Sequence, residues 1–287
     1  MRRFLRGVRA AVRLAAAAAV TLFSYLLALA SGALGIVSPT ARVRGQGAAF
    51  QLWSRALCRI FGVRVERQGT APAPPFLLVS NHLSYIDILV LGTSLPCVFV
   101  AKAEIDGWPV FGAICRSVNT IFIDRRMKRK LPEILRRIEA ALAARQGVVI
   151  FPEGTSGPGD GVLPFRSSLL ELAAGVGRPV HHVTINYRVA EGEMPAHLSV
   201  GWWGDMPLGE HLKNFLALSR VEASLHFGDE PFAADDRKRL AADLQREVAS
   251  RFLPFVEREE VERLLRLRHE DPESLPAVLR KAPDRFR

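Results

Sequence analysis

The feature that most constrains this chain is an uncharged, largely apolar stretch from Leu14 to Val37. As an α-helix its 24 residues would be roughly 36 Å long, which is enough to cross the hydrocarbon core of a bilayer. The sequence therefore predicts that the amino-terminal region is attached to a membrane. Pro39 is expected to close the helix. The basic residues that precede the stretch are Arg2, Arg3, Arg6, Arg9 and Arg13.

Three interpretations of this stretch stay open. A secretory signal peptide also begins with basic residues, and Ala28-Leu29-Ala30 resembles a cleavage site, but the apolar run exceeds the usual length. A single transmembrane helix would keep the arginines on the cytoplasmic side. A helix that lies in or dips into the interface would suit the alanine-rich, moderately hydrophobic composition. Residues 48–63 have the apolar spacing of a second helix, which would pack on the membrane or on the main domain.

The overall composition indicates a folded protein with an anionic partner. Of the 287 residues, 49% are hydrophobic, which excludes an intrinsically disordered chain. The formal net charge of +10 suits nucleic acid, an anionic membrane surface or a phosphorylated substrate. Nucleic acid is the poorest fit, because the arginines lie mostly at the amino terminus and in amphipathic patterns without a recognised binding motif. The three cysteines are too scattered for a disulfide framework or a zinc site, so we expect no metal.

Beyond a proline-rich connector at residues 71–75, short apolar runs alternate with helical patterns. Runs of this kind are typical of buried parallel strands. Helices are expected over residues 127–146, where Gly147 ends the pattern, and over residues 232–256. The alternation predicts an α/β fold, with a layered mixed or mostly parallel sheet flanked by helices and an N-terminal membrane helix or helical hairpin. The expected strands are Phe76–Ser80, Cys97–Ala101, Asn119–Asp124, Val148–Phe151 and Val180–Asn186.

We divide the chain into three parts. Residues 1–64 hold the basic segment and the membrane-associated helices, and residues 65–256 form the α/β domain. Residues 257–287 are highly charged and end in a proline-punctuated tail, which we expect to be marginally stable or mobile and without a catalytic role.

The first segment that suggests chemistry is residues 81–87, where His82 is followed five positions later by Asp87. It lies between a strand and a helix, where reactive side chains collect in open α/β sheets. Histidine can act as a base near neutral pH, and a carboxylate on its second ring nitrogen fixes its tautomer. Five residues along a helix turn a side chain by about 140°, so we expect His82 in the loop and Asp87 reaching back. Alone, the segment also fits a structural histidine at a helix cap.

The second segment, Phe151–Thr155, again follows a strand. Gly154 allows the backbone to approach a ligand closely. Glu153 and Thr155 offer an acceptor and a donor for hydroxyl or phosphate groups. Taken alone, this segment also fits a turn with a capping threonine.

Four blocks in fixed order connect these segments. They are Asn-His-x4-Asp at residues 81–87, Phe-Ile-Asp-Arg at 122–125, Phe-Pro-Glu-Gly-Thr at 151–155, and an apolar block before Asn186-Tyr187. The last has His181-His182 where Pro-Val is usual. From Phe76 to Tyr187 the chain thus resembles the glycerolipid acyltransferase family, the group that contains the lysophosphatidate acyltransferases.

The resemblance implies an O-acyltransferase that acts on a lysolipid. His82 would be the general base for an acceptor hydroxyl, with Asp87 orienting it, and the hydroxyl oxygen would attack the thioester of acyl-CoA or of an acyl carrier protein. The resemblance implies no covalent acyl-enzyme and no cofactor. Arg125 would bind an anionic group of the acceptor. Further substrate-binding positions are Asn81, Glu153, Gly154 and Thr155, with Lys102 as a secondary candidate.

The sequence indicates the identity of the lysolipid acceptor less clearly than the type of reaction. Ser156 follows Thr155, whereas phosphatidate-forming members often have arginine there, so one phosphate contact worth about 1–3 kcal/mol is missing. Asn119 also departs from a common glycine. Residues 163–169 and 202–206 resemble a bacterial subgroup that includes enzymes for lysophosphatidate and for lyso-ornithine lipid. We expect lysophosphatidate first and lyso-ornithine lipid second, acylated at the cytoplasmic face of the bacterial inner membrane.

Two rival activities share some of these features. A non-catalytic lipid-binding protein would explain the charge and the membrane helix, but not the combination of His82, Asp87 and Glu153. A thioesterase would use the same donor and pass the acyl group to water. Release of free fatty acid without an acceptor would identify it.

Overall fold

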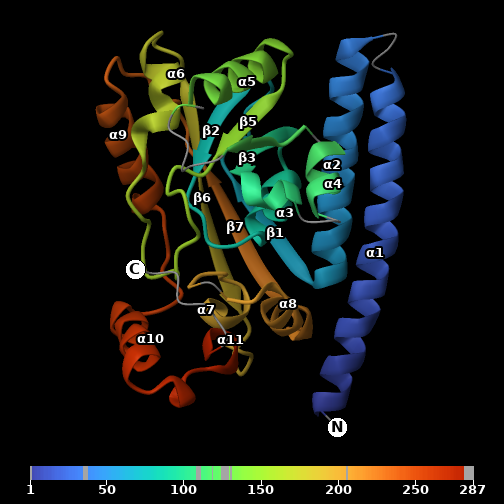
Figure 1. Ribbon diagram of the computed structural model, residues 1–287, viewed down its shortest axis with the longest axis vertical. Helices are drawn as coiled ribbons and strands as arrows, with labels where there is room; N and C mark the ends of the chain where they lie inside the picture. Colours follow the sequence, from blue (N-terminus) through green and yellow to red (C-terminus); the bar gives the residue numbers. More distant parts are fainter. Residues whose placement is uncertain are drawn as a thin grey trace.

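The computed structural model describes residues 2–34, 38–107, 111–117, 119–123, 129, 131–204 and 206–280. Its centre is a seven-stranded sheet in the order β1-β7-β6-β2-β5-β3-β4 (Figure 1). Neighbouring strands pair in parallel except β6 and β7, which are antiparallel. The predicted α/β fold with a mostly parallel sheet is confirmed. The strands are β1 (Val63–Gln68), β2 (Phe76–Ser80), β3 (Cys97–Lys102), β4 (Ile121–Ile123), β5 (Gly147–Ile150), β6 (Val180–Val189) and β7 (Val221–Phe227).

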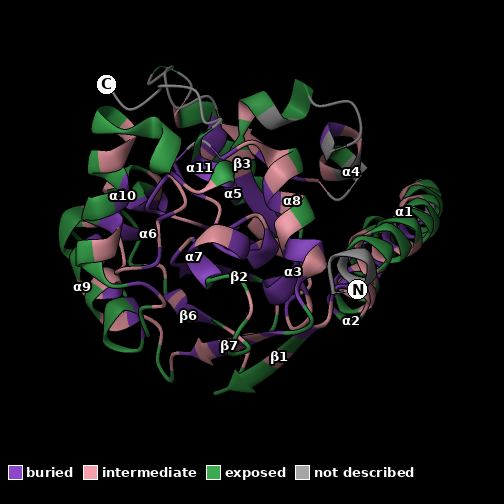
Figure 2. Ribbon diagram, turned by 90° about the horizontal axis from the view of Figure 1, so that it is seen from below, coloured by how far each residue is buried: buried purple, intermediate pink, exposed green. Residues whose placement is uncertain are grey.

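Helices cover both faces of the sheet. One layer contains α2 (Pro39–Phe61), α3 (Ile86–Gly92) and α8 (Leu208–Ala217), and the other contains α5 (Leu131–Ala143), α6 (Glu171–Ala174) and α9 (Arg237–Ser250). All five residues of β2 are buried, because successive side chains point into opposite layers. Leu78 packs with the first layer, whereas Leu77 and Val79 pack with the second. Figure 2 shows these buried strands between helices whose outer sides are exposed.

A helical hairpin precedes the sheet. Helix α1 (Arg2–Leu34) runs antiparallel to α2, and the indole Nε1 of Trp53 donates to Thr21 Oγ1 at 3.0 Å (Figure 1). Near the start of α1, Arg13 donates to three backbone carbonyl oxygens at and after the end of α8. Pro39 not only follows α1 but lies in the first turn of α2, where its fixed φ fits and Ser38 provides the cap. The hairpin is therefore held on the α/β domain at the end where Arg13 meets α8.

The expectation of a mobile tail is wrong for the tail residues that the structure describes. Residues 258–280 form α10 (Arg258–Glu270), a 3₁₀ turn at Pro272–Ser274 and α11 (Ala277–Arg280). They pack in a separate apolar cluster around Trp203, to which α10 contributes Val261 and Leu264. Apolar residues three apart lie on one face of a helix, so a highly charged helix can still bury one stripe.

Other differences concern edges and ends. Strands β1 and β7 lie outside the predicted set, and β1 exposes most of its charged side chains at the sheet edge. Helix α9 is shorter than expected, because Asp236 caps it by accepting from Lys238 N and Arg239 N. Residues 127, 128 and 130 of the expected helix 127–146 lie outside the described residues. Two short helices complete the chain, α4 (Phe111–Ser117) and α7 (Ala196–Ser199).

Candidate active site

The loop between β2 and α3 is anchored by Asn81. Its Nδ2 donates to the carbonyl oxygen of Ile185 at 3.0 Å, and Ile185 N donates back to Asn81 Oδ1 at 2.8 Å. The side chain is buried and takes the place of a strand residue beside β6. Asn81 therefore fixes where the loop leaves the sheet. Its predicted contact with substrate has no direct support from this arrangement.

His82 and Asp87 lie together as their spacing predicts. Nδ1 of His82 is 2.8 Å from Oδ2 of Asp87, with His82 in the loop and Asp87 in the first turn of α3. The same oxygen accepts from the backbone N–H groups of Leu83 at 2.7 Å and Ser84 at 3.0 Å. Asp87 is fully buried, whereas the His82 side chain is 20% exposed. Because Asp87 holds Nδ1, Nε2 is the nitrogen able to take a proton from a substrate.

Tyr187 completes this arrangement, and sequence reasoning missed its role. Its hydroxyl donates to Asp87 Oδ1 at 2.8 Å from the carboxyl half of β6. Burial, and then the charge of Asp87, raise the pKa of Tyr187 far above its ordinary value, so the hydroxyl stays a donor. By its sequence pattern alone, a tyrosine in an apolar strand is predicted to be an ordinary core residue. The one sign of a role in the site was its position at the end of the fourth matching sequence block.

Glu153 joins the second segment to the first. The side chain is 3% exposed, Oε1 accepts from His82 N at 2.8 Å, and Oε2 accepts from Leu163 N at 3.2 Å. Burial raises the pKa of Glu153 to about 8, although the two N–H donors act in the opposite direction. Both oxygens thus bind backbone, and the residue supports His82 from within the protein.

Phe151 fixes the plane of the imidazole. Its ring stacks on that of His82 with centroids 4.2 Å apart and an angle of 18°. On its other side Phe151 stacks with Phe99 of β3 at 6.0 Å. The His82 ring is therefore held by a hydrogen bond at Nδ1 and by an aromatic face.

The remaining predicted residues lie around this pair or outside the described part. Gly154 has φ +77° and its N–H donates to Phe151 O at 3.1 Å, which is the turn that glycine permits. Thr155 is half-buried next to this turn. Lys102 is exposed at the end of β3. Arg125 lies outside the described residues, two positions after β4 ends.

A third loop closes the arrangement. The hydroxyl of Ser156 donates to the carbonyl oxygen of Trp202, and Trp202 N donates to Leu83 O at 2.8 Å. The indole of Trp202 meets the ring of Tyr85 edge to face. The segment around Trp202 is thus bonded to the loop of His82 and to the loop that carries the predicted substrate-binding residues Glu153, Gly154 and Thr155.

Comparison with known proteins identifies the family. The family model described as "Acyltransferase" matches residues 62–186. The chain is 35% identical over 207 residues to a lyso-ornithine lipid O-acyltransferase of Brucella abortus, covering 68% of this chain and 78% of that protein. This chain belongs to the acyltransferase family. It is also 30% identical over 180 residues to a 1-acyl-sn-glycerol-3-phosphate acyltransferase of Neisseria gonorrhoeae, covering 63% and 69% of the two chains.

A solved structure agrees with this fold. The crystal structure of a 1-acyl-sn-glycerophosphate acyltransferase from Thermotoga maritima superposes with a TM-score of 0.63 at 20% identity, covering 87% of this chain and 97% of that one. As an acyltransferase, the chain carries the matched family region from β1 into β6. The contact between Tyr187 and Asp87 and the loop around Trp202 bring in residues just beyond that region.

The contact from Tyr187 predicts a change in turnover. In Tyr187→Phe, Asp87 loses a donor to its Oδ1, so we expect kcat for acyl transfer to fall about tenfold, the equivalent of one hydrogen bond to a charged group. The KM for the acceptor should stay near wild type, because Tyr187 is buried away from solvent. Steady-state kinetics measures both. Thr184→Val removes a buried hydroxyl from the same strand, one that donates to Val248 O, and is the matched control. Equal kcat values for Tyr187→Phe and wild type would disprove the role.

The buried carboxyl of Glu153 predicts a pH-dependent stability. Its pKa of about 8 in the folded chain exceeds the ordinary value of 4.5, so the unfolded chain loses this proton first as the pH rises. Stability relative to Glu153→Gln should be highest below about pH 4.5 and fall towards pH 8, by at most about 1.4 kcal/mol per pH unit. Urea unfolding at several pH values measures this difference. Glu139→Gln, on the exposed side of α5, is the control, and a difference for Glu153→Gln that is constant with pH would refute the assignment.

Proposed function

We propose that this acyltransferase moves a fatty acyl group from the thioester of acyl-CoA or of an acyl carrier protein to the hydroxyl of a lysolipid, with His82 as general base. The contact between His82 Nδ1 and the buried Asp87 carboxylate carries this proposal. A histidine with one ring nitrogen held by a buried carboxylate and part of its side chain exposed has the geometry that general base catalysis needs.

The proposed reaction proceeds in two proton transfers around one acyl transfer. Nε2 of His82 accepts the hydroxyl proton while the oxygen bonds to the thioester carbonyl carbon. The carbon–sulfur bond then breaks, and the imidazolium returns its proton to the leaving thiolate. Asp87 stabilises the imidazolium throughout, and Tyr187 and Glu153 position the two partners. No residue forms an acyl-enzyme, and no cofactor is required besides the donor.

Acceptor binding is proposed for the residues that the family resemblance names. Arg125 pairs with the anionic group of the head group. Gly154 and Thr155 lie in the turn beside His82 and are placed to line the acceptor. Asn81 acts through the backbone of β6, and Lys102 at the end of β3 contributes a positive charge.

Lyso-ornithine lipid is the acceptor that the observations favour, which reverses the order expected from sequence alone. Ser156 occupies the position where phosphatidate-forming members often have arginine, and its hydroxyl is bonded to Trp202 O. An acceptor without phosphate would not need the missing cation. Lyso-ornithine lipid O-acyltransferases are also the more similar relatives, at 35% identity against 30%. Lysophosphatidate is the second candidate because of the Neisseria relatives.

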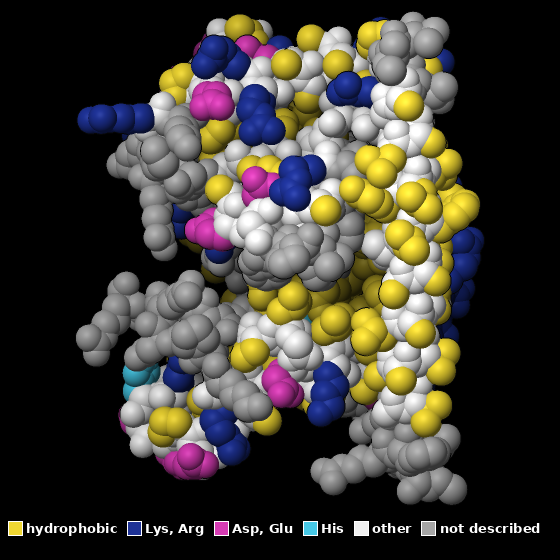
Figure 3. Space-filling view, turned by 45° about the vertical axis from the view of Figure 1, so that its right-hand side comes forward, with side chains coloured by type: hydrophobic (Ala, Val, Ile, Leu, Met, Phe, Trp, Pro, Cys, Tyr) yellow, Lys and Arg dark blue, Asp and Glu magenta, His cyan; other side chains and the backbone are white. Residues whose placement is uncertain are grey.

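We propose attachment of the hairpin to the cytoplasmic face of the bacterial inner membrane. Among the described residues, α1 is long and apolar enough to cross a membrane. Its contacts with α2 and with the end of α8 instead hold it along the domain, which favours a helix lying in the interface. Figure 3 shows an apolar surface along α1. The exposed apolar side chains of α1 are Val8, Val12, Leu14, Leu22, Phe23, Leu26, Leu27 and Leu29.

A pair of substitutions tests the membrane proposal. Leu22 and Phe23 are each 61% exposed on α1, and Leu253 is 62% exposed outside the hairpin. Burial of one such side chain in the bilayer contributes about 1.5–3 kcal/mol, so Leu22→Glu with Phe23→Glu should lower the vesicle-bound fraction at least about tenfold. Flotation with phosphatidylethanolamine and phosphatidylglycerol vesicles measures it. Leu253→Glu should float like wild type, and flotation of the double variant to the same extent would reject the proposal.

The acceptor is tested with purified full-length protein in detergent. Labelled acyl-CoA is supplied with lyso-ornithine lipid or with lysophosphatidate, and His82→Ala runs beside the wild type. We expect product from lyso-ornithine lipid with wild type and a loss of at least about a hundredfold with His82→Ala. Product from lysophosphatidate alone would move the assignment to the second candidate. Full activity of His82→Ala would exclude the mechanism, and fatty acid released without acceptor would indicate a thioesterase.

A further inference from the structure

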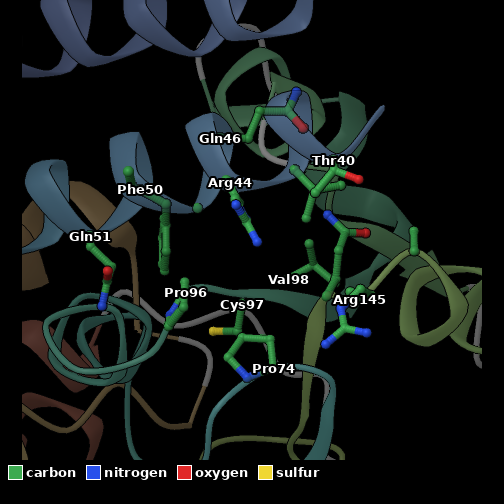
Figure 4. A pocket seen from close by; sticks show the side chains of 15 residues that line it. Thr40, Arg44, Gln46, Phe50, Gln51, Pro74, Pro96, Cys97, Val98 and Arg145 are labelled. Carbon is green, nitrogen blue, oxygen red and sulfur yellow. The ribbon is translucent and has the colours of Figure 1, made fainter. Parts of the chain in front are cut away.

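A cavity lies at the amino ends of β3 and β5, whereas His82 lies at the carboxyl end of the neighbouring strand β2. It has a volume of about 360 Å³. One wall is the first half of α2, from Thr40 to Gln51, and the facing wall is formed by residues 96–98 at the start of β3 and 144–146 before β5 (Figure 4). His82 follows the carboxyl end of β2, which has five residues and is roughly 17 Å long. Since β2, β5 and β3 are parallel, the cavity is separate from the candidate active site.

The cavity gathers positive charge from two elements. Arg44 enters from α2, and Arg145 from the turn after α5 (Figure 4). None of the 15 residues that line it in the described part of the chain is acidic. Within that part, neither arginine forms an ion pair with a carboxylate. Two guanidinium groups that line one cavity, with no carboxylate among its lining residues, favour the binding of an anionic ligand.

The backbone at Arg145 gives an independent reason to assign its side chain a role. Helix α5 ends with Arg145 N donating to Leu142 O at 2.9 Å and Gln146 N donating to Ala141 O at 3.0 Å. Arg145 has φ +62°, a left-handed conformation that glycine adopts at this cap without strain. An arginine here strains the backbone, so its presence is better explained by what the side chain binds than by the turn.

The position of the cavity relative to α1 indicates the source of the anion. The pairing of Thr21 with Trp53 places the stretch of α1 from Leu22 to Leu29, which carries five exposed apolar side chains, beside the part of α2 that lines the cavity. Packed helices lie about 8–10 Å apart. If α1 lies in the interface, as the proposed function has it, the cavity is one helix layer away from the bilayer surface, on the far side of α2 from α1.

We propose that this cavity binds the phosphate of an anionic membrane phospholipid. Arg44 and Arg145 bind the phosphate oxygens, and Thr40, one turn before Arg44 on α2, lies in the same wall to bond the rest of the head group. Phe50 and Val98 provide an apolar floor for the glycerol and the first acyl carbons. The bound lipid is not a reactant, because the cavity opens at the other end of the sheet. It orients the enzyme on an anionic bilayer.

The test measures binding of soluble short-chain phosphatidylglycerol to the full chain in neutral detergent by calorimetry. Arg44→Gln and Arg145→Gly should each weaken binding about tenfold, the loss expected for one charge-assisted contact. Arg145→Gly should melt at or above the wild-type temperature, because glycine relieves the left-handed position. Arg137→Gln removes an exposed arginine from α5 and should bind like wild type. Short-chain phosphatidylcholine should bind about tenfold more weakly than phosphatidylglycerol.

Three results would overturn the proposal. Wild-type affinity in both Arg44→Gln and Arg145→Gly would show that the cavity is not the site. Equal affinity for phosphatidylcholine would remove the role of net charge. Inorganic phosphate binding as tightly as phosphatidylglycerol would identify a free phosphate site instead of a lipid site. These experiments measure lipid binding and not turnover. Their results can therefore be interpreted even if the acyl-transfer proposal fails.

Discussion

The rest of the site depends on the burial of the Asp87 carboxylate. A charge that is fully removed from water costs several kcal/mol unless hydrogen bonds replace its hydration. Asp87 is completely buried and is bonded to His82, to two backbone N–H groups of its own loop and to the hydroxyl of Tyr187. These groups come from the β2–α3 loop and from β6. The loop is bonded to β6 through Asn81, so the position of His82 depends on the pairing of β2 with β6.

A second buried carboxyl group, that of Glu153, extends the same constraint to the neighbouring loop. Glu153 accepts from His82 N and from Leu163 N, while Gly157 N donates to His82 O. The two loops are therefore joined at His82, by one bond to the Glu153 side chain and one backbone bond from Gly157, at the carboxyl ends of the adjacent parallel strands β2 and β5. Because both oxygens of Glu153 accept from backbone N–H groups, the role that we propose for it is to hold His82 in position.

The sequence was most informative where local pattern and long-range geometry agree. The continuous apolar runs predicted β2, β3, β5 and β6, and the offset of five residues predicted the contact of His82 with Asp87. Strand β1 could not be predicted in this way, because as an edge strand it exposes alternate charged side chains. Tyr187 and Trp202 reach the site from distant segments, and no local pattern encodes such contacts. Helix α10 was not predicted to pack, because most of its residues are charged and only a narrow apolar stripe with Val261 and Leu264 is buried.

The hairpin that we propose for membrane attachment is also part of the catalytic core. Phe50 of α2 meets Phe99 edge to face at 5.8 Å, Phe99 stacks on Phe151, and Phe151 stacks on His82. Together with the contact of Phe50 and Trp53, these rings form a continuous aromatic column from the hairpin to the proposed base. Because α2 supplies a wall of the hydrophobic core, the boundary expected at residue 64 does not separate two independently folded domains. It separates the segment proposed to bind the membrane from the rest of the chain. A lipid bound against α2 would act on the same packed unit that holds His82.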